Sequence, residues 1–210
     1  MEDSLVEFNG MTFHYRQNTT DWGIIQEACG GLYTKYFDIE PEELWFDVGA
    51  NIGAFTCYAA SKGAIVSALE PFEDNFNLLI SNIIENGFED RVKAHMLAVS
   101  DKVEVIDLHI DTNNFGNCSK YARSLTKIVQ VKSISSRAFN IFDDMCLKID
   151  TEGCEYEILS ELDLSRVKKL VLENHYWLQP QENTVGIIDL IHSNFNNVEE
   201  FGGYMIYAWN

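Results

Sequence analysis

Short apolar runs alternate with helix-like segments along this chain, and this alternation limits the folds open to it. Strand-length apolar runs lie at 44–48, 65–69 and 92–99. Segments with apolar residues at helical spacing lie between them, at 55–62 and 74–86. Strands that alternate with helices over short connections form parallel sheets covered by helices on both faces. The sequence therefore predicts an α/β fold with a doubly wound, Rossmann-like sheet.

The alternation continues to the C-terminus and ends in a hairpin. Two further strands are predicted at 146–149 and 169–173, with helices after them at 156–162 and 185–193. The last two strands, 198–201 and 204–209, are joined by Gly202-Gly203. Strands joined by so short a turn pair antiparallel. We therefore expect a seven-stranded sheet whose C-terminal strand is antiparallel.

Two regions depart from this alternation. Between residues 100 and 135, apolar and polar residues alternate, which indicates antiparallel strands on either side of a polar loop at 111–123. Residues 1–43 predict a hairpin around Asn9-Gly10, then a short helix with Asp21 as its N-cap. We expect 1–43 to form a small N-terminal hairpin and helical cap over a ligand cleft, and 44–210 to form the main domain.

The charge balance restricts the partners of the protein. Lys and Arg total 15 and Asp and Glu total 33, so the formal net charge is −18. Such a surface is a poor match for nucleic acid or for an anionic membrane. No apolar run approaches the ~18 residues of a membrane span, and the five cysteines form no CxxC pair. We expect a cytoplasmic protein with free thiols that binds neither nucleic acid nor membranes; its oligomeric state stays open.

A glycine-containing turn follows the first core strand, with the sequence Asp47-Val48-Gly49-Ala50-Asn51-Ile52-Gly53. Gly49 allows a turn that a β-carbon would obstruct, and Gly53 allows close helix packing. Glu70 ends the next strand, 17 residues after Gly53. A carboxylate at that place can accept hydrogen bonds from both ribose hydroxyls of an adenosine. The combination predicts a nucleoside site.

The turn differs from the pattern of dinucleotide-binding proteins. Its spacing is GxNxG instead of GxGxxG, and Asp47 stands where a pyrophosphate would be repelled. A carboxylate there suits a cationic group such as the α-amino group of a methionine moiety. The ligand expected is therefore S-adenosylmethionine, and NAD is disfavoured.

Five blocks of the sequence resemble FkbM-type methyltransferases in order and spacing. The blocks are 46–53, Leu-Glu-Pro at 69–71, Asn82 with Asn86-Gly87, 98–101 and 147–155. Together they cover roughly residues 27–177, and Lys-Ile-Asp-Thr-Glu-Gly at 148–153 is the most specific of them. The resemblance implies a class I methyltransferase fold, S-adenosylmethionine as cofactor and O-methylation of a hydroxyl on a sugar or another small molecule.

The expected cofactor-binding residues come mainly from these blocks. They are Asp47, Gly49, Ala50, Asn51, Gly53, Phe55, Glu70, Pro71, Phe72, Ala98, Val99 and Asp150. By analogy with the family, Ala98 and Val99 flank the adenine. Phe72 either packs on the adenine or belongs to the core.

Methyl transfer requires an acceptor oxygen in line with the sulfonium methyl group and removal of the hydroxyl proton. Asp150 and His175 follow neighbouring strands, so we expect them to reach one substrate. His175 is the expected general base, because an unperturbed imidazole has a pKa near neutrality. Asp150 would orient either His175 or the substrate hydroxyl. Glu152 is a third catalytic candidate, with helix capping near Gly153 as the alternative.

Substrate contacts are expected from Tyr33, Asn117, Ser119, Arg123 and Glu155. The stretch 118–137 holds five of the 15 basic residues and no acidic residue, which favours an anionic small molecule; the alternative is a solvated strand with outward-facing lysines. Asp150, Glu173 and Asn174 form an oxygen set of the kind that binds Mg²⁺. A metal is nevertheless not expected.

Two other functions are compatible with the same fold. A nucleotide or nucleic-acid base methyltransferase would favour an Asn/Asp-Pro-Pro-Tyr-like block at residue 150 and a broad basic face, and the sequence has neither. A non-catalytic S-adenosylmethionine-binding module would bind the cofactor without turnover.

Overall fold

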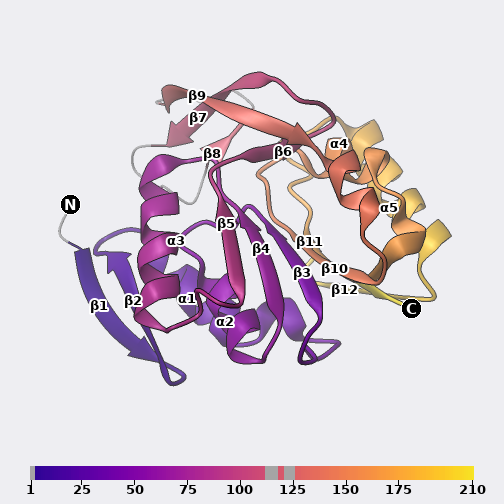
Figure 1. Ribbon diagram of the computed structural model, residues 1–210. Helices are drawn as coiled ribbons and strands as arrows, with labels where there is room; N and C mark the ends of the chain where they lie inside the picture. The colour runs from indigo at the N-terminus through magenta and orange to yellow at the C-terminus, as the bar shows by residue number, and fades with distance from the viewer. Residues whose placement is uncertain (1–2, 112–117, 121–125) are drawn as a thin grey trace.

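The computed structural model describes residues 3–111, 118–120 and 126–210 (Figure 1). Its centre is a seven-stranded mixed sheet. From edge to edge the strands are β12 (Asn197–Phe201), β13 (Met205–Trp209), β11 (Val167–Glu173), β10 (Met145–Ile149), β3 (Leu44–Val48), β4 (Ile65–Leu69) and β5 (Val92–His95). Strand β13 pairs antiparallel with β11 and β12, and the other pairings in this sheet are parallel. The α/β fold with an antiparallel last strand is as predicted.

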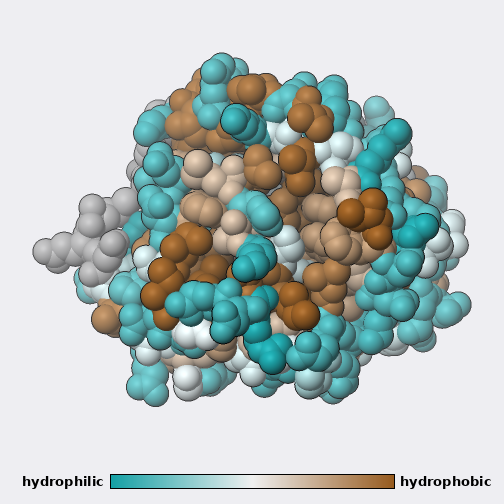
Figure 2. Space-filling model, viewed as in Figure 1, coloured by the Kyte–Doolittle hydropathy of each residue, from teal (hydrophilic) through white to brown (hydrophobic). Residues whose placement is uncertain are grey.

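Helices cover both faces of this sheet, because successive strand residues point to opposite sides. On β3, Trp45 belongs to a core cluster with α2, whereas Phe46 belongs to the cluster beneath α4 and α5. The α-helices are α1 (Asp21–Cys29), α2 (Ala54–Ser61), α3 (Glu73–Glu85), α4 (Glu155–Glu161) and α5 (Gln181–Asn194). Three 3₁₀ helices are η1 (Leu32–Thr34), η2 (Ser136–Ile141) and η3 (Leu164–Arg166). Figure 2 shows apolar side chains across the middle of one face, surrounded by hydrophilic ones.

The strand predicted at 92–99 is wrong as a single element. It divides into β5 and β6 (Ala98–Ser100), with a tight turn between them in which the Leu97 amide donates to the His95 carbonyl (2.9 Å). Strand β6 leaves the central sheet and joins a second sheet of order β6-β9-β7-β8, with β7 (Val105–Asp111), β8 (Cys118–Ser119) and β9 (Thr126–Ser135). The antiparallel pairing of β7 with β9 is as predicted.

The N-terminal hairpin consists of β1 (Asp3–Phe8) and β2 (Met11–Arg16), which pair antiparallel around Asn9-Gly10 as predicted. It lies along α3, where Asn82 Oδ1 accepts from the His14 amide (2.6 Å) and Asn86 Oδ1 from the Thr12 amide (2.9 Å). The asparagine block noted in the sequence therefore fixes the hairpin to the domain.

Asp21 is not the N-cap of α1, because Thr20 occupies that position. The carboxylate of Asp21 is fully buried and accepts from Arg16 Nε (2.8 Å) and Nη2 (2.9 Å). A buried guanidinium requires such a paired acceptor, and this requirement overrides the capping preference.

The N-terminal segment also packs on the core of the main domain, because Phe13 and Ile25 share one core cluster with Trp45. The helices in the described part of the chain are too short or too polar to cross a membrane.

Candidate active site

Two neighbouring cavities lie at the carboxyl ends of the central strands. The first is lined by residues that include Gly49, Glu70, Pro71, Ala98 and Val99. The second is lined by residues that include Tyr33, Ala50, Phe55, Lys148 and Glu173. Asn51, Asp150 and Glu152 line both. A ligand that spans these three residues can therefore occupy both cavities.

Glu70 supplies a buried carboxylate to the first cavity. Its Oε2 accepts from the Asn51 amide (2.8 Å), and its Oε1 accepts from the Phe72 amide (3.0 Å). Burial raises the pKa of Glu70 to about 7, against the opposing effect of these hydrogen bonds. The side chain is held in one orientation at the place where the sequence predicts a ribose.

Both polar and apolar residues line the first cavity. Its apolar part includes Ala98, Val99 and Pro71. Phe72 lies instead in a small core cluster with Leu108 and Ile110. This cluster supports the core alternative for Phe72. Sequence reasoning missed several apolar residues of this lining, among them Leu97, Ile106 and Leu108. The alternation at 103–110 signalled the buried face of Ile106 and Leu108 but not which site that face would cover.

The glycine turn brings β3 against the segment after β10. Gly49 has φ +80°, and a β-carbon there would lie 1.9 Å from the Asp150 carbonyl oxygen. Gly53 has φ +84°, and a β-carbon there would lie 2.5 Å from Leu79 Cδ1 on α3. Gly53 thus permits close packing, as predicted, and Gly49 permits the two active-site loops to touch.

Asp47 lies outside the lining of both cavities. Its side chain is fully buried, accepts from Thr56 Oγ1 (2.5 Å) and lies 3.2 Å from Lys148 Nζ. In this ligand-free arrangement Lys148 supplies the positive charge beside Asp47, and the expected contact of Asp47 with a cationic ligand stays a prediction. Register between β3 and β10 creates this pair, which a single sequence does not show.

Lys148 is a site residue that sequence reasoning missed. Besides Asp47, it contacts Asp150 Oδ2 (3.4 Å) and donates to the Gly49 carbonyl (2.7 Å). Burial favours the neutral amine, but the charges of Asp47 and Asp150 outweigh it and raise the pKa of Lys148. The available signal was a lysine inside an apolar strand, where an unpaired charge would be costly.

The second cavity is acidic. Carboxyl groups line it from Glu27, Asp150, Glu152 and Glu173. Tyr33 donates its hydroxyl proton to Asp150 Oδ2 (3.2 Å). Burial and the charge of Asp150 raise the pKa of Glu27, and the same two causes raise that of Glu173 to about 8. A positive charge placed among these groups would lower their mutual repulsion.

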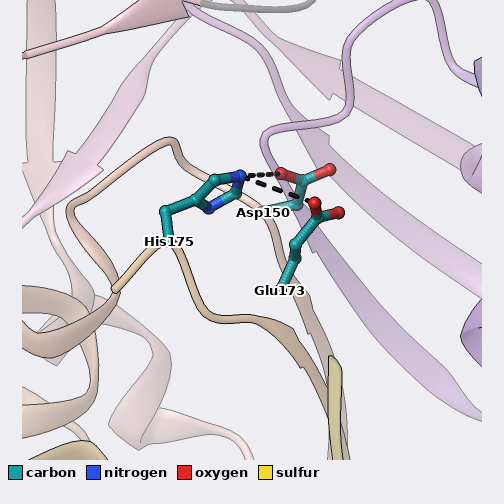
Figure 3. A group of neighbouring side chains, drawn as sticks. All are labelled: Asp150, Glu173 and His175. Atoms are coloured by element: carbon teal, nitrogen blue, oxygen red, sulfur yellow. Dashed lines mark ion pairs between the residues drawn. The ribbon is translucent and has the colours of Figure 1, made fainter. Parts of the chain in front are cut away.

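His175 faces this acidic group from the end of β11 (Figure 3). Its Nδ1 lies 2.9 Å from Glu155 Oε1, and its Nε2 lies 3.9 Å from Asp150 Oδ1 and 3.6 Å from Glu173 Oε1. Burial alone would lower its pKa, but the hydrogen bond to Glu155 and the nearby carboxylates raise it to about 10. The expectation of a near-neutral pKa is therefore wrong for the ligand-free protein, in which His175 is an imidazolium.

Two predicted substrate residues instead shape the loop that carries Glu152. Ser119 is buried and donates its hydroxyl proton to the Glu152 carbonyl (2.6 Å). Glu155 is fully buried and accepts from the Gly153 amide (3.0 Å). Helix α4 begins at Glu155 with Cys154 as N-cap, so capping by Glu152 is wrong. Asn117 and Arg123 lie outside the described residues.

Asn174 belongs to the oxygen set considered for Mg²⁺. It is buried, and its Oδ1 accepts from Gln179 Nε2 (2.9 Å). Its amide donates to the Tyr204 carbonyl (2.7 Å), where the chain turns after β11. The other two residues of that set, Asp150 and Glu173, lie close to His175.

The basic stretch at 118–137 mostly faces outward. Lys127 and Lys132 are exposed on β9, and Arg137 pairs with Glu161 at the surface. Lys120 does line the first cavity, and its Nζ lies 2.7 Å from Glu157 Oε2. Within the described part of this stretch, solvated basic side chains are thus more numerous than cavity-lining ones.

The chain is similar in sequence to one known methyltransferase and in fold to solved structures of others. It is 24% identical over 155 residues to the hexuronic acid methyltransferase AglP of Haloferax volcanii, covering 70% of this chain and 62% of that protein. Among solved structures, it is similar to a precorrin-6y C5,15-methyltransferase of Geobacter metallireducens (12% identity, 93% of each chain, TM-score 0.51). It is also similar to the tRNA (uracil-54, C5)-methyltransferase of Pyrococcus abyssi (10% identity, 99% of this chain and 44% of that one, TM-score 0.53).

These structural similarities, at identities of 10 to 12%, concern the fold alone. The family follows from the sequence. Residues 47–202, well over half of the chain, match the Methyltransferase FkbM domain, and the chain therefore belongs to the FkbM methyltransferase family.

Proposed function

We propose that this protein is an S-adenosylmethionine-dependent methyltransferase that methylates a hydroxyl group of a small molecule, with an acidic sugar as the favoured class. One observation carries the proposal. A cavity with a buried carboxylate, that of Glu70, and an apolar wall that includes Ala98 and Val99 adjoins a second, acidic cavity, and Asn51 and Asp150 line both. This arrangement suits a nucleoside joined to a positively charged group.

The first cavity fits the adenosine part of the cofactor. Glu70 can exchange its backbone partners for the ribose hydroxyls, while Ala98 and Val99 offer an apolar wall to the adenine. Gly49 lines this cavity, and Ala50, the next residue of the turn, lines the second one.

The second cavity fits the charged part of the cofactor and the acceptor. When bound, S-adenosylmethionine supplies an activated methyl group on a positively charged sulfur. Asp150, held by Tyr33 and Lys148, provides the negative charge that attracts such a group and orients the acceptor hydroxyl. Methylation joins the acceptor oxygen to the methyl carbon, leaves the electron pair of the broken C–S bond on sulfur, and releases the hydroxyl proton.

The proton must pass to a carboxylate or to water. His175 holds its own proton in the ligand-free protein, so Asp150 and Glu152 are the better acceptors in the predicted catalytic set. In the ligand-free protein His175 is thus a positive charge that keeps these carboxylates together.

The similarity to a hexuronic acid methyltransferase supports an acidic sugar as acceptor. The chain spans 62% of the length of that relative, so the acceptor stays a proposal. The net charge of −18 disfavours nucleic acid as the acceptor.

Transfer of a radiolabelled methyl group tests the proposal. We expect label in hexuronic acids or their glycosides and none in tRNA. Label in tRNA alone, or labelled cofactor that binds without turnover on any hydroxyl compound, would contradict it.

A further inference from the structure

Three side chains at the ends of two neighbouring strands converge on one point of the acidic cavity. Asp150 follows β10, Glu173 ends β11, and His175 comes two residues later. One ligand atom from each lies within 4.8 Å of the other two, and Figure 3 shows the three side chains directed toward one another. Parallel strands bring their carboxyl ends to the same edge of a sheet, so the topology itself assembles this group.

The two ring nitrogens of His175 have different surroundings. Nδ1 is hydrogen-bonded to Glu155, which is itself fully buried. Nε2 makes no hydrogen bond among the described residues, and its carboxylate neighbours lie at 3.6 to 3.9 Å. The side chain is only 3% exposed. A buried ring nitrogen is thus aimed at a set of carboxylate oxygens that stand too far away for hydrogen bonds.

This arrangement is typical of a metal-binding histidine. Such a histidine usually contacts a carboxylate through one ring nitrogen and the metal through the other. Two ligand atoms that each lie about 2.1 Å from one cation are about 3.0 to 3.5 Å apart. The observed separations of 3.6 and 3.9 Å from Nε2 need only a small contraction to reach that range.

We propose that a divalent cation binds between Asp150, Glu173 and His175 Nε2, with Glu152 beside it. A mixed set of imidazole nitrogen and carboxylate oxygen favours Mn²⁺ or Zn²⁺ over Mg²⁺. The site differs from the Asp150, Glu173 and Asn174 set considered from the sequence, and it replaces the expectation that no metal binds.

The role of the cation rests on the proposed function. An acidic sugar that enters the second cavity meets the carboxylates of Glu27, Asp150, Glu152 and Glu173. A bound divalent cation offsets this negative charge and offers coordination positions to the carboxylate and hydroxyl oxygens of the acceptor. It thereby makes an acidic cavity compatible with an anionic substrate.

Mn²⁺ binding to the untagged full chain tests the site, by electron paramagnetic resonance at about pH 8, where imidazole ligands compete better with protons. We expect saturable binding with nitrogen modulation in the spin echo. His175→Gln should abolish that modulation and weaken binding at least ~10-fold, and Glu173→Gln should weaken it similarly. The matched controls His192→Gln and Glu200→Gln, both at exposed positions, should leave it unchanged.

A further variant tests whether Glu155 positions His175 for metal binding. Glu155→Gln should keep the nitrogen modulation while weakening Mn²⁺ binding by about 10- to 100-fold. Two results would overturn the metal site. One is a spectrum that contains only the signal of free Mn²⁺ at metal concentrations up to about 1 mM. The other is nitrogen modulation that persists in His175→Gln. If one variant does not fold, as judged by circular dichroism, the other still tests the site.

Stabilisation of the protein by S-adenosylhomocysteine distinguishes failure of the metal site from failure of the proposed function. Stabilisation by S-adenosylhomocysteine without Mn²⁺ binding would refute the metal site alone. Mn²⁺ binding without any response to S-adenosylhomocysteine would refute the cofactor assignment and leave the metal site standing.

Discussion

The ammonium group of Lys148 lies 3.2 Å from the carboxylate of Asp47, and both side chains are almost completely shielded from solvent. The two residues are register partners on the adjacent parallel strands β10 and β3. Lys148 also donates to the Gly49 carbonyl, so the pair ties the sheet to the turn between the two cavities. The stability of the sheet and the shape of the site therefore depend on the same buried charges.

Replacing Lys148 should be strongly destabilising. Lys148→Met leaves Asp47 as an uncompensated buried charge, which should lower the free energy of unfolding by about 3 to 5 kcal/mol. Urea denaturation measures this loss. In the double variant Asp47→Asn/Lys148→Met the loss should be smaller than the sum of the two single losses. Lys93→Met, at an exposed position on β5, serves as the control and should change stability by less than about 0.5 kcal/mol.

The close approach at Gly49 should make this position far more sensitive to substitution than Gly87. Gly49→Ala adds a β-carbon 1.9 Å from the Asp150 carbonyl oxygen, so it must displace the loop that lines both cavities. We expect loss of cofactor binding and a lower melting temperature. Gly87→Ala is the matched control, because Gly87 also has a positive φ (+69°) but its β-carbon would meet no atom within 4 Å. Its cost should be limited to the backbone strain of about 1 to 2 kcal/mol. Equal effects of the two substitutions would refute this steric argument.

Glu70 should make the stability of the ligand-free protein depend on pH. Its pKa is about 7 in the folded protein and 4.5 ordinarily, so the folded state keeps this proton as pH rises and the unfolded state loses it. Its stabilising contribution is complete below pH 4.5 and is lost as pH rises through about 7. Relative to Glu70→Gln, the free energy of unfolding of the wild type should thus fall by up to about 3 kcal/mol between about pH 4.5 and pH 8. Denaturation of both proteins across this interval measures the difference, and a difference independent of pH would show that Glu70 titrates normally.

Tyr33 should act on the reaction through Asp150. Tyr33→Phe removes the hydroxyl that donates to Asp150 Oδ2 and retains the ring that packs on Phe55. We expect kcat to fall by about 10-fold while stability changes by about 1 kcal/mol. Tyr36→Phe is the control, since Tyr36 packs through its ring on Tyr207. A fall in kcat of the same size in both variants would show that the Tyr33 hydroxyl has no specific role in the reaction.

The sheet and its helices could be predicted because burial imposes a local period on the sequence. The division of 92–99 into β5 and β6 could not, because Ala98 and Val99 are as apolar as a central strand requires and differ only in their partner, β9. The hydrophobicity of a residue indicates that it is buried, but it does not indicate which of the two sheets buries it.

The positions of the candidate site residues were predictable to a similar degree. Glu70 and Asp150 follow strand ends of the central sheet, and parallel topology brings strand ends together. The roles of Asp47, Ser119 and Glu155 were not predictable, because each is decided by a partner distant in sequence: Lys148, the Glu152 carbonyl and His175. The protonation of His175 likewise follows from carboxylates on other segments of the chain.

Calorimetric titration with S-adenosylhomocysteine tests the central claim most directly. The account predicts saturable binding of one molecule per chain, at least ~10-fold weaker in Glu70→Ala and unchanged in Glu73→Ala, whose residue is exposed at the start of α3. It also predicts no comparable binding of NAD. Absence of S-adenosylhomocysteine binding to the folded protein, or equal binding by Glu70→Ala, would contradict it.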